Sequence, residues 1–343
     1  MQQRLPILSL LAVVVPLLGG LTGCTKEPDL VVYVALDQVF SEPLIRRFEA
    51  ESGLNVRAEY DVEANKTVGL VRRIREEVNR PRCDVFWNNE IAHTVKLAND
   101  GLLASYDSPS AAGIPSTFRD PENRWTGFAA RARVLIVNTD LVEDPESIRG
   151  MWDLVDERWH GKVGMARPLT GTTLTHMTAL FGVLGEDEAN RYLATIKSLS
   201  EEGKVNLAAG NAHVMRLVSA GELAWGWTDT DDFNVALEKG APVVAIYPDA
   251  DELGTMMIPN TIAILDAAPH KDNAQRFVDW VLRPEIEAEL ARARSAQIPV
   301  RADVERPEHV KGPGQFRVME VDFAAVGAEI DTRATELKER FLD

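Results

Sequence analysis

The sequence lacks the short motifs that mark most enzyme classes. It contains no Gly-x-Ser-x-Gly elbow, no phosphate-binding loop with a lysine, no dinucleotide-binding glycine fingerprint and no paired-histidine zinc helix. Its 6 histidines are scattered without the spacing of a metal site. A carboxylate pair for glycoside hydrolysis can be assembled from so many acidic residues, but no pair stands out. An enzymatic function is therefore less favoured than a binding function, and a hydrolase stays as an alternative.

Positive charge is also in deficit. The chain has 37 Lys and Arg residues against 53 Asp and Glu residues, which gives a net charge of −16 at pH 7. Such an acidic surface repels nucleic acid and has no hold on anionic lipid headgroups, so neither is an expected partner. The acidity can equally serve solubility alone.

Long apolar runs are absent except at the N-terminus. There, Arg4 precedes an apolar stretch at residues 5–18 that is too short to span a bilayer. Residues 21–24 read Leu-Thr-Gly-Cys and resemble a lipobox, the site at which bacterial lipoproteins are cleaved and the new N-terminal cysteine is acylated. We therefore expect a lipoprotein signal peptide at 1–23 and a lipid anchor on Cys24, outside the cytoplasmic membrane. The alternative is an ordinary secretory signal with a chance cysteine.

Cysteine is nearly absent, with 2 residues in the whole chain. If Cys24 carries lipid, Cys83 has no partner, so a structural disulfide is not expected despite the oxidising compartment. Cys83 lies just before or within an apolar strand. We interpret it as a small buried residue and not as a reactive thiol.

The rest of the chain alternates expected strands and helices. Removing residues 1–23 from the 343 leaves 320, which is too many for one compact core and typical of two. Strands are expected at 30–36, 55–60, 85–87, 134–138, 163–165, 223–228 and 256–265. Helices are expected at 41–53, 67–79, 91–99, 172–184, 188–199, 273–282 and 284–294. This alternation predicts an α/β fold of two lobes, with mostly parallel sheets and the chain crossing between them.

Polar residues follow the expected strands, where ligands bind in open parallel sheets because loops and helix N-termini gather there. In the first half of the chain these residues are Asp37, Gln38, Glu63, Asn65, Asn89 and Glu90. In the second half they are Thr170, Gly171, Thr172, Thr173, Asn211 and Asp229. Asn260 is a further candidate, although it can also be a simple turn residue. Such convergence is typical of a binding cleft.

Two features suit an anion. Residues 170–173 precede a helical stretch, so their backbone amides, hydroxyls and the positive helix end can hold negative charge, unless the threonine is only an N-cap. Arg131 and Arg133 lie two apart in an extended segment and hence on one face. They can bind a carboxylate or phosphate, or they can brace an ion pair between the lobes.

Asp229, Asp231 and Asp232 form the most unusual cluster, at the end of an apolar strand. Three carboxylates within four residues suit a hard cation, which prefers oxygen ligands, or the ammonium group of a substrate. The alternative is helix capping, because residues 233–239 look helical and acidic residues in a first turn complement the helix dipole.

Between Val31 and about Val300 the chain contains a set of recognisable segments at residues 32–35, 84–87, 127–134, 158–163, 268–274 and 295–299. With these segments the chain resembles the solute-binding proteins of ABC importers, specifically the ferric-iron-type family. The resemblance implies the type II-like periplasmic binding fold, with two Rossmann-like lobes joined by crossover strands that close on a ligand. We predict a linker with the lipidated cysteine at 24–30, lobe 1 at 31–130 plus 255–300, lobe 2 at 131–254, and a C-terminal helical segment packing on the lobes at 301–343.

The iron sites of this family use a pair of adjacent tyrosines with a synergistic anion, and here the sequence departs from the family. Asp231 and Asp232 fall at the tyrosine pair, Asp37 falls near the histidine of the first lobe, and Asn89 or Glu90 falls near the glutamate. Without phenolates, either carboxylates hold a metal or the cleft holds a polar organic molecule or oxyanion.

We therefore expect a lipid-anchored, periplasmic and monomeric solute-binding protein that delivers its ligand to an ABC permease. Its ligand is expected to be iron or another metal at Asp231 and Asp232, with an anion and no resident cofactor. One alternative is an organic anion or phosphonate-like solute at Thr172, Thr173 and Arg131. A second alternative is an extracytoplasmic hydrolase on the same scaffold.

Overall fold

A computed structural model describes residues 27–61 and 68–342. The strands are β1 (Leu30–Val34), β2 (Val56–Tyr60), β3 (Val85–Asn88), β4 (Thr126–Asn138), β5 (Val163–Ala166), β6 (Val205–Ala208), β7 (Trp225–Asp229), β8 (Val243–Ile246) and β9 (Met257–Ile264). The helices are α1 (Gln38–Ser52), α2 (Val68–Glu76), α3 (Ile91–Asn99), α4 (Gly171–Leu184), α5 (Glu186–Glu201), α6 (Asn211–Ser219), α7 (Thr230–Glu238), α8 (Lys271–Val281), α9 (Pro284–Arg292) and α10 (Phe323–Leu342).

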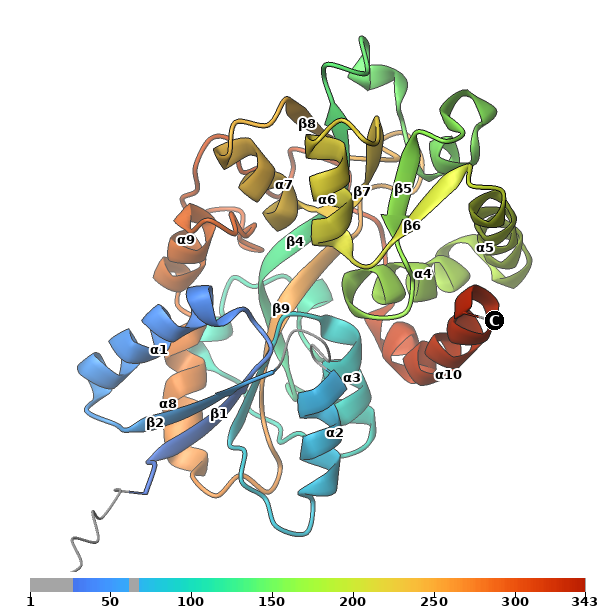
Figure 1. Ribbon diagram of the computed structural model, residues 1–343. Helices are drawn as coiled ribbons and strands as arrows, with labels where there is room; N and C mark the ends of the chain where they lie inside the picture. Colours follow the sequence, from blue (N-terminus) through green and yellow to red (C-terminus); the bar gives the residue numbers. More distant parts are fainter. Residues whose placement is uncertain (1–26, 62–67, 343) are drawn as a thin grey trace, which may run out of the picture.

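The strands form two parallel groups joined by antiparallel crossover strands (Figure 1). Along the sheet the order is β2-β1-β3-β9-β4-β7-β5-β6, and β8 pairs with β4. Strand β1 is parallel to β2 and β3, and β5 is parallel to β6 and β7. Strands β9 and β4 run antiparallel between the two groups. The predicted α/β fold with crossover strands is confirmed. Below, lobe 1 is the part around β1–β3 and lobe 2 is the part around β5–β8.

Strand β4 carries the chain from one lobe to the other. It pairs with β9 as far as Ala132 and with β7 from Arg133 onward. The register shifts at Ala129, whose positive φ of 42° accompanies a bulge. This switch lies two residues beyond the predicted lobe boundary between 130 and 131, and the predicted division of the chain into lobes stays a prediction. Because the switch falls between them, Arg131 and Arg133 lie where the lobes meet.

Burial explains why the apolar runs form strands. All five residues of β1 are buried, and Trp87 of β3 packs against Phe128 of β4 and Phe277 of α8. Cys83 is a buried free thiol that donates to the Val85 carbonyl, and burial raises its pKa well above the ordinary value. Removing apolar side chains such as those of β1 from water is the main favourable term in folding. The prediction that Cys83 is a small buried residue is confirmed.

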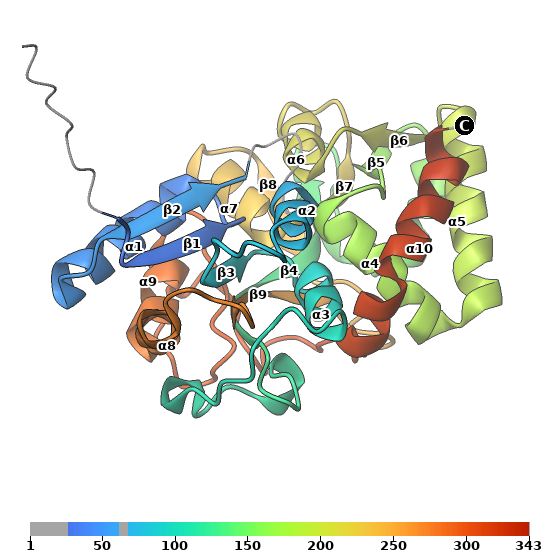
Figure 2. The same ribbon diagram turned by 90° about the horizontal axis from the view of Figure 1, so that it is seen from below.

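Helix α10 lies alongside both α3 of lobe 1 and α4 of lobe 2 (Figure 2). At Gly327, an added Cβ would come within 2.4 Å of the Val95 side chain, so only glycine allows this close approach. Farther along the helix, Arg333 Nη2 forms an ion pair with Glu186 Oε2 at 2.7 Å, and the guanidinium stacks on the Phe181 ring. The C-terminal helix therefore contacts both lobes. None of the described helices is long and apolar enough to cross a membrane.

Candidate ligand-binding site

A cavity of about 290 Å³ lies where the carboxyl ends of the parallel strands of both lobes meet. Most of the residues predicted from strand ends line it: Asp37, Asn89, Glu90, Arg131, Thr170, Gly171, Thr172, Thr173, Asn211, Asp229, Asp231 and Asp232. Lobe 1 contributes the residues after β1 and β3, and lobe 2 contributes those after β5, β6 and β7. A ligand in this cavity would therefore contact both lobes.

Some predicted residues lie elsewhere. Gln38 belongs to the first turn of α1, which begins three residues before the expected start at 41, and it donates to Glu42 at the surface. Asn260 is a buried residue of β9 and not a turn residue; it donates to Gln297 Oε1 at 2.8 Å and to the Ala129 carbonyl. Cys24, Glu63 and Asn65 lie outside the described residues.

Asp229 is held in the floor of the cavity by several donors. Its Oδ1 accepts from Arg133 Nη1 at 2.6 Å. Its Oδ2 accepts from Thr172 Oγ1 at 2.7 Å and from Asn211 Nδ2 at 3.0 Å. Burial disfavours the charged form, but Arg133 and Arg131 outweigh it and lower the pKa of Asp229. Asp229 is thus a fixed, charge-compensated carboxylate that links β7 to β4, α4 and α6.

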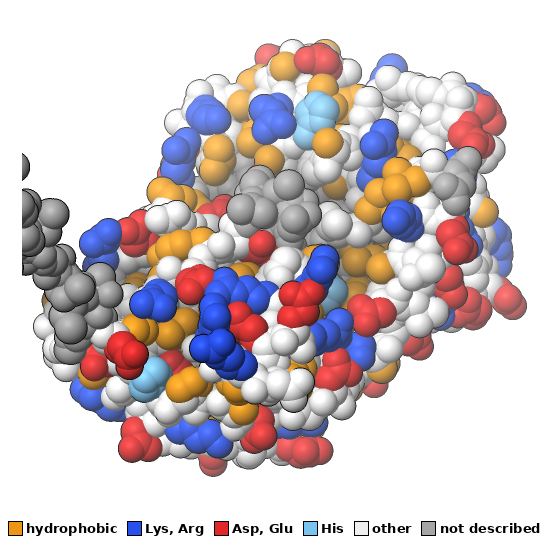
Figure 3. All heavy atoms as spheres, turned by 60° about the horizontal axis from the view of Figure 1, so that its bottom comes forward, with side chains coloured by type: hydrophobic (Ala, Val, Ile, Leu, Met, Phe, Trp, Pro, Cys, Tyr) orange, Lys and Arg blue, Asp and Glu red, His pale blue; other side chains and the backbone are white. Residues whose placement is uncertain are grey.

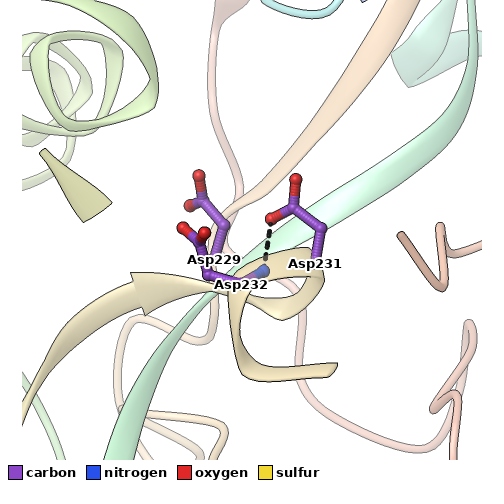
Figure 4. Close-up of side chains that lie close together, drawn as sticks. All are labelled: Asp229, Asp231 and Asp232. Carbon is purple, nitrogen blue, oxygen red and sulfur yellow. Dashed lines mark hydrogen bonds between the residues drawn. The ribbon is translucent and has the colours of Figure 1, made fainter. Parts of the chain in front are cut away.

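Asp231 and Asp232 point from the first turn of α7 beside Asp229 (Figure 4). The three side chains offer oxygens that all lie within 4.8 Å of one another. Asp231 accepts from the Asp232 backbone N–H at 3.0 Å and lies 3.3 Å from Arg131, and Asp232 accepts from Thr228 Oγ1 at 3.1 Å. The arrangement can hold a cation.

The pKa values of Asp231 and Asp232 are both raised, chiefly by burial. At Asp231 the nearby Arg131 partly offsets this effect. At Asp232 the repulsion from Asp231 and Asp229 adds to it. Negative charge at this end of the cavity is therefore only partly compensated within the protein.

The N-terminal ends of two helices, α4 and α6, lie in the wall of the cavity. Helix α4 follows Thr170, whose side chain makes no capping hydrogen bond, and α6 follows Gly210, which has no side chain to make one. The orphan backbone amides of both turns therefore suit an anion. The Thr172 and Thr173 hydroxyls donate to Asp229 and Asn211 instead. The amides, and not these hydroxyls, are the donors open to a ligand.

Two contacts in the cavity wall join the lobes. Glu90 caps α3 by accepting from Ala92 N at 2.6 Å, and it also accepts from Thr175 Oγ1 of α4 at 2.6 Å. Arg131 donates to the Asn89 carbonyl and pairs with Asp231. The ion pair of Arg131 is with Asp231 of lobe 2, and its contact with lobe 1 is the hydrogen bond to the Asn89 carbonyl.

The sequence analysis missed Arg167, Ala209, Gly210 and Ala212, which also line the cavity. Arg167 directly follows β5, so the strand-end rule applied to it already. The other three lie just after β6, and the same rule would have found them had β6 been recognised as a strand. The sequence analysis also missed Thr175, whose role carries no sequence signal because it depends on the position of Glu90. On the face shown in Figure 3, basic and acidic side chains are interspersed, so this face offers no continuous basic patch for a polyanion.

The fold and the cavity define a class: a two-lobed α/β protein with a polar site between the lobes, which is the architecture of periplasmic binding proteins. The sequence profile described as "Bacterial extracellular solute-binding protein" matches residues 44–317. The chain belongs to this family, as the resemblance predicted. The family is one of binding proteins and not of enzymes.

Named relatives match most of this chain at low identity. Iron uptake protein A1 of Synechocystis is 24% identical over 85% of this chain and 81% of its own. A putative 2-aminoethylphosphonate-binding periplasmic protein of Salmonella typhimurium is 24% identical over 77% of this chain and 75% of its own. The solved ferric binding protein from Campylobacter jejuni superimposes with a TM-score of 0.80 at 23% identity, covering 91% of this chain and 99% of its own.

Proposed function

We propose that this protein captures a metal cation, iron or another hard ion, together with an anion, in the cavity between its lobes. The observation that carries the proposal is the placement of Asp231 and Asp232, whose oxygens line the cavity within 4.8 Å of each other and of Asp229. Hard cations prefer carboxylate oxygens. A cation bound there offsets the burial and repulsion that raise the pKa of both carboxyls.

The remaining ligands are proposed from the surrounding wall. Asp229 is already paired with Arg133, so Asp231 and Asp232 supply the main ligand oxygens, with oxygens of Asp37 and Glu90 on the lobe 1 side. The backbone amides at the start of α4 hold the accompanying anion. The names of the iron uptake and ferric-binding relatives support iron. The aspartates replace the phenolates of that family, which makes the choice of metal a matter for experiment.

We further propose that the lobes close on the cargo and that an ABC permease receives it. Lobe closure is supported by the cavity wall, which both lobes supply, so a ligand that contacts both stabilises the closed state. The mature protein is proposed to be a monomer tethered through lipid on Cys24. The tether would keep the cavity near the membrane in which the permease lies.

Metal analysis of gently purified protein, followed by a thermal-shift series, tests the proposal. A metal cation should be present at about one equivalent, and re-addition to stripped protein should stabilise it by about 2.7 kcal/mol at a hundred times the Kd. The Asp231→Asn/Asp232→Asn variant should lose this stabilisation. The matched control is Asp251→Asn/Glu252→Gln, an exposed acidic pair of lobe 2 outside the cavity, which should keep it. Unchanged stabilisation in the first variant refutes the metal proposal.

A second candidate ligand is an organic anion or phosphonate-like solute. It is favoured by the two helix N-termini that reach one cavity and by Arg131 and Arg167 beside them. The name of the Salmonella relative points the same way. Mass spectrometry of the ligand released on denaturation distinguishes the two, because an organic compound without stoichiometric metal favours this candidate over the first.

A further inference from the structure

Arg131 is positioned on the same carboxylates that a cationic cargo would use. Its Nη1 lies 3.3 Å from Asp231 Oδ2 and 3.7 Å from Asp229 Oδ2. Its Nη2 donates to the carbonyl of Asn89, in the loop after β3 of lobe 1. Only 12% of the side chain is exposed. One guanidinium therefore contacts an acidic residue of lobe 2 and the backbone of lobe 1 at the same time.

Arg131 and Arg133, the two arginines beside the aspartate cluster, differ in whether they line the cavity. Arg133 is almost fully buried and pairs with Asp229 Oδ1 at 2.6 Å, beneath the cavity. Arg131 lines the cavity itself and is the arginine that contacts Asp231. A cation that binds Asp231 therefore has to share its carboxylate with a guanidinium or displace it. A cation and a guanidinium on the same carboxylate repel each other strongly, because the site is partly buried.

We propose that Arg131 is an exchangeable internal counter-ion: it occupies Asp231 and clasps Asn89 while the cavity is empty, and a cationic cargo displaces it from Asp231. This inference rests on the proposed capture of a cation and adds a specificity-determining residue to it. Arg131 lowers the affinity for a bare cation, because every binding event has to break its ion pair. The displaced guanidinium lies in the cavity wall, where it favours cargo that brings an anion with the cation.

The first arm of the test needs no cation. Hydrogen–deuterium exchange is measured on the stripped protein for residues 88–91 and 230–233 in the wild type and in Arg131→Met. The variant should exchange at least about threefold faster in both segments, because the contact that joins them is gone. Arg167→Met is the matched control. Arg167 is an exposed residue of the same cavity that forms no ion pair in the described part of the chain. This control should change neither segment. Equal exchange rates in the wild type and Arg131→Met overturn the proposed clasp, by which we mean the simultaneous contact of Arg131 with Asp231 and with the Asn89 carbonyl.

The second arm measures the Kd of Mn²⁺ alone by titration calorimetry. Arg131→Met should bind Mn²⁺ about tenfold more tightly than the wild type, and Arg167→Met no more than about threefold more tightly through the lost charge alone. Asp231→Asn breaks the same ion pair from the other side. It should speed exchange as Arg131→Met does but should abolish Mn²⁺ binding, which separates loss of the clasp from loss of folding. Weaker Mn²⁺ binding in Arg131→Met overturns the exchange of counter-ions.

The two proposals fail in different ways. If neither the wild type nor any variant binds Mn²⁺ but Arg131→Met still speeds exchange, the clasp stands as a closing contact while the proposed cation capture and the exchange of counter-ions both fail. If the wild type binds Mn²⁺ and the cation slows exchange at both 88–91 and 230–233, Arg131 stays in place and only the inference fails. Displacement predicts faster exchange at 88–91 and slower exchange at 230–233 on adding Mn²⁺.

Discussion

Asp229 differs from its sequence neighbours Asp231 and Asp232 in how far the surrounding residues compensate its charge. Asp229 receives hydrogen bonds from Arg133, Thr172 and Asn211. The charges of Arg133 and Arg131, with the hydrogen bonds from Thr172 and Arg133, lower its pKa in spite of its burial. Asp231 and Asp232 face the cavity with fewer partners, and their pKa values are raised. Asp229 is therefore stabilised within the protein, whereas Asp231 and Asp232 are the carboxylates that the proposed cation would stabilise. The comparison shows that neighbouring cationic charge and fixed donors, and not burial alone, separate the compensated carboxylate from the two uncompensated ones.

The largest expected effect tests the compensated side of this comparison. Replacing Arg133 by Met leaves Asp229 buried without its main partner, and we expect the free energy of unfolding to fall by about 3 to 5 kcal/mol. Urea denaturation measures the loss. The Asp229→Asn/Arg133→Met double variant should recover much of it, because no uncompensated charge remains. A loss below about 1 kcal/mol in the single variant would mean that Asp229 does not depend on this ion pair.

Asp249 provides an uncompensated carboxyl away from the cavity. It is buried, has a positive φ of 56° and accepts from Met151 N at 3.2 Å. Burial raises its pKa to about 6, with Glu252 and Asp153 adding repulsion. The stability that this group contributes is therefore present below its unfolded pKa and is lost as pH rises through about 6. Asp249→Asn should be about 2 kcal/mol more stable than the wild type at pH 7.5.

The Asp249→Asn gain should shrink to nothing near pH 4, where both proteins carry a neutral side chain. Asparagine also tolerates the positive φ and keeps the acceptor for Met151. Thermal unfolding across this pH range measures the difference. A gain that is independent of pH would assign the effect to the backbone and not to the charge.

Asp232 tests the uncompensated side within the cavity. Asp232→Asn removes a carboxylate whose pKa is raised by burial and by its acidic neighbours, so the stripped protein should gain about 1 kcal/mol near neutral pH. The sign follows from linkage: the wild type loses stability as pH rises past the ordinary carboxyl range, and the variant does not. The same variant should lose most of the stabilisation by added cation. A variant that is less stable than the wild type without cation contradicts the comparison.

The smallest effect concerns the contact between the lobes at Glu90. Thr175→Ala removes one hydrogen bond to Glu90 while the cap of α3 remains, and we expect a loss of about 1 kcal/mol. Thermal unfolding of the stripped protein measures it. Thr178→Ala, on the same helix and without a side-chain partner in the described structure, is the control. Equal losses in both would show that packing, and not the contact with Glu90, sets the cost.

Much of the fold was predictable because its signals are local. The unbroken apolar run of β1 and the alternation of strands and helices are signals carried by short segments of the sequence. The positions of Asp37, Asn89, Asp229 and Asp231 followed from the rule that polar residues after parallel strands converge. Glu90 was found by the same rule, but its bond to Thr175 was not, because the two residues lie 85 positions apart.

The sequence by itself determined the class of fold, the family and most of the residues that surround the cavity, because local pattern, motif resemblance and the ends of the strands indicate them. Only the tertiary structure decided which member of the Asp229, Asp231 and Asp232 cluster is compensated. It also decided that Arg133 lies beneath the cavity and Arg131 within it. The physical reason is that the state of a carboxylate depends on the donors within about 3 Å of it, and strands, helices and loops distant in sequence supply those donors.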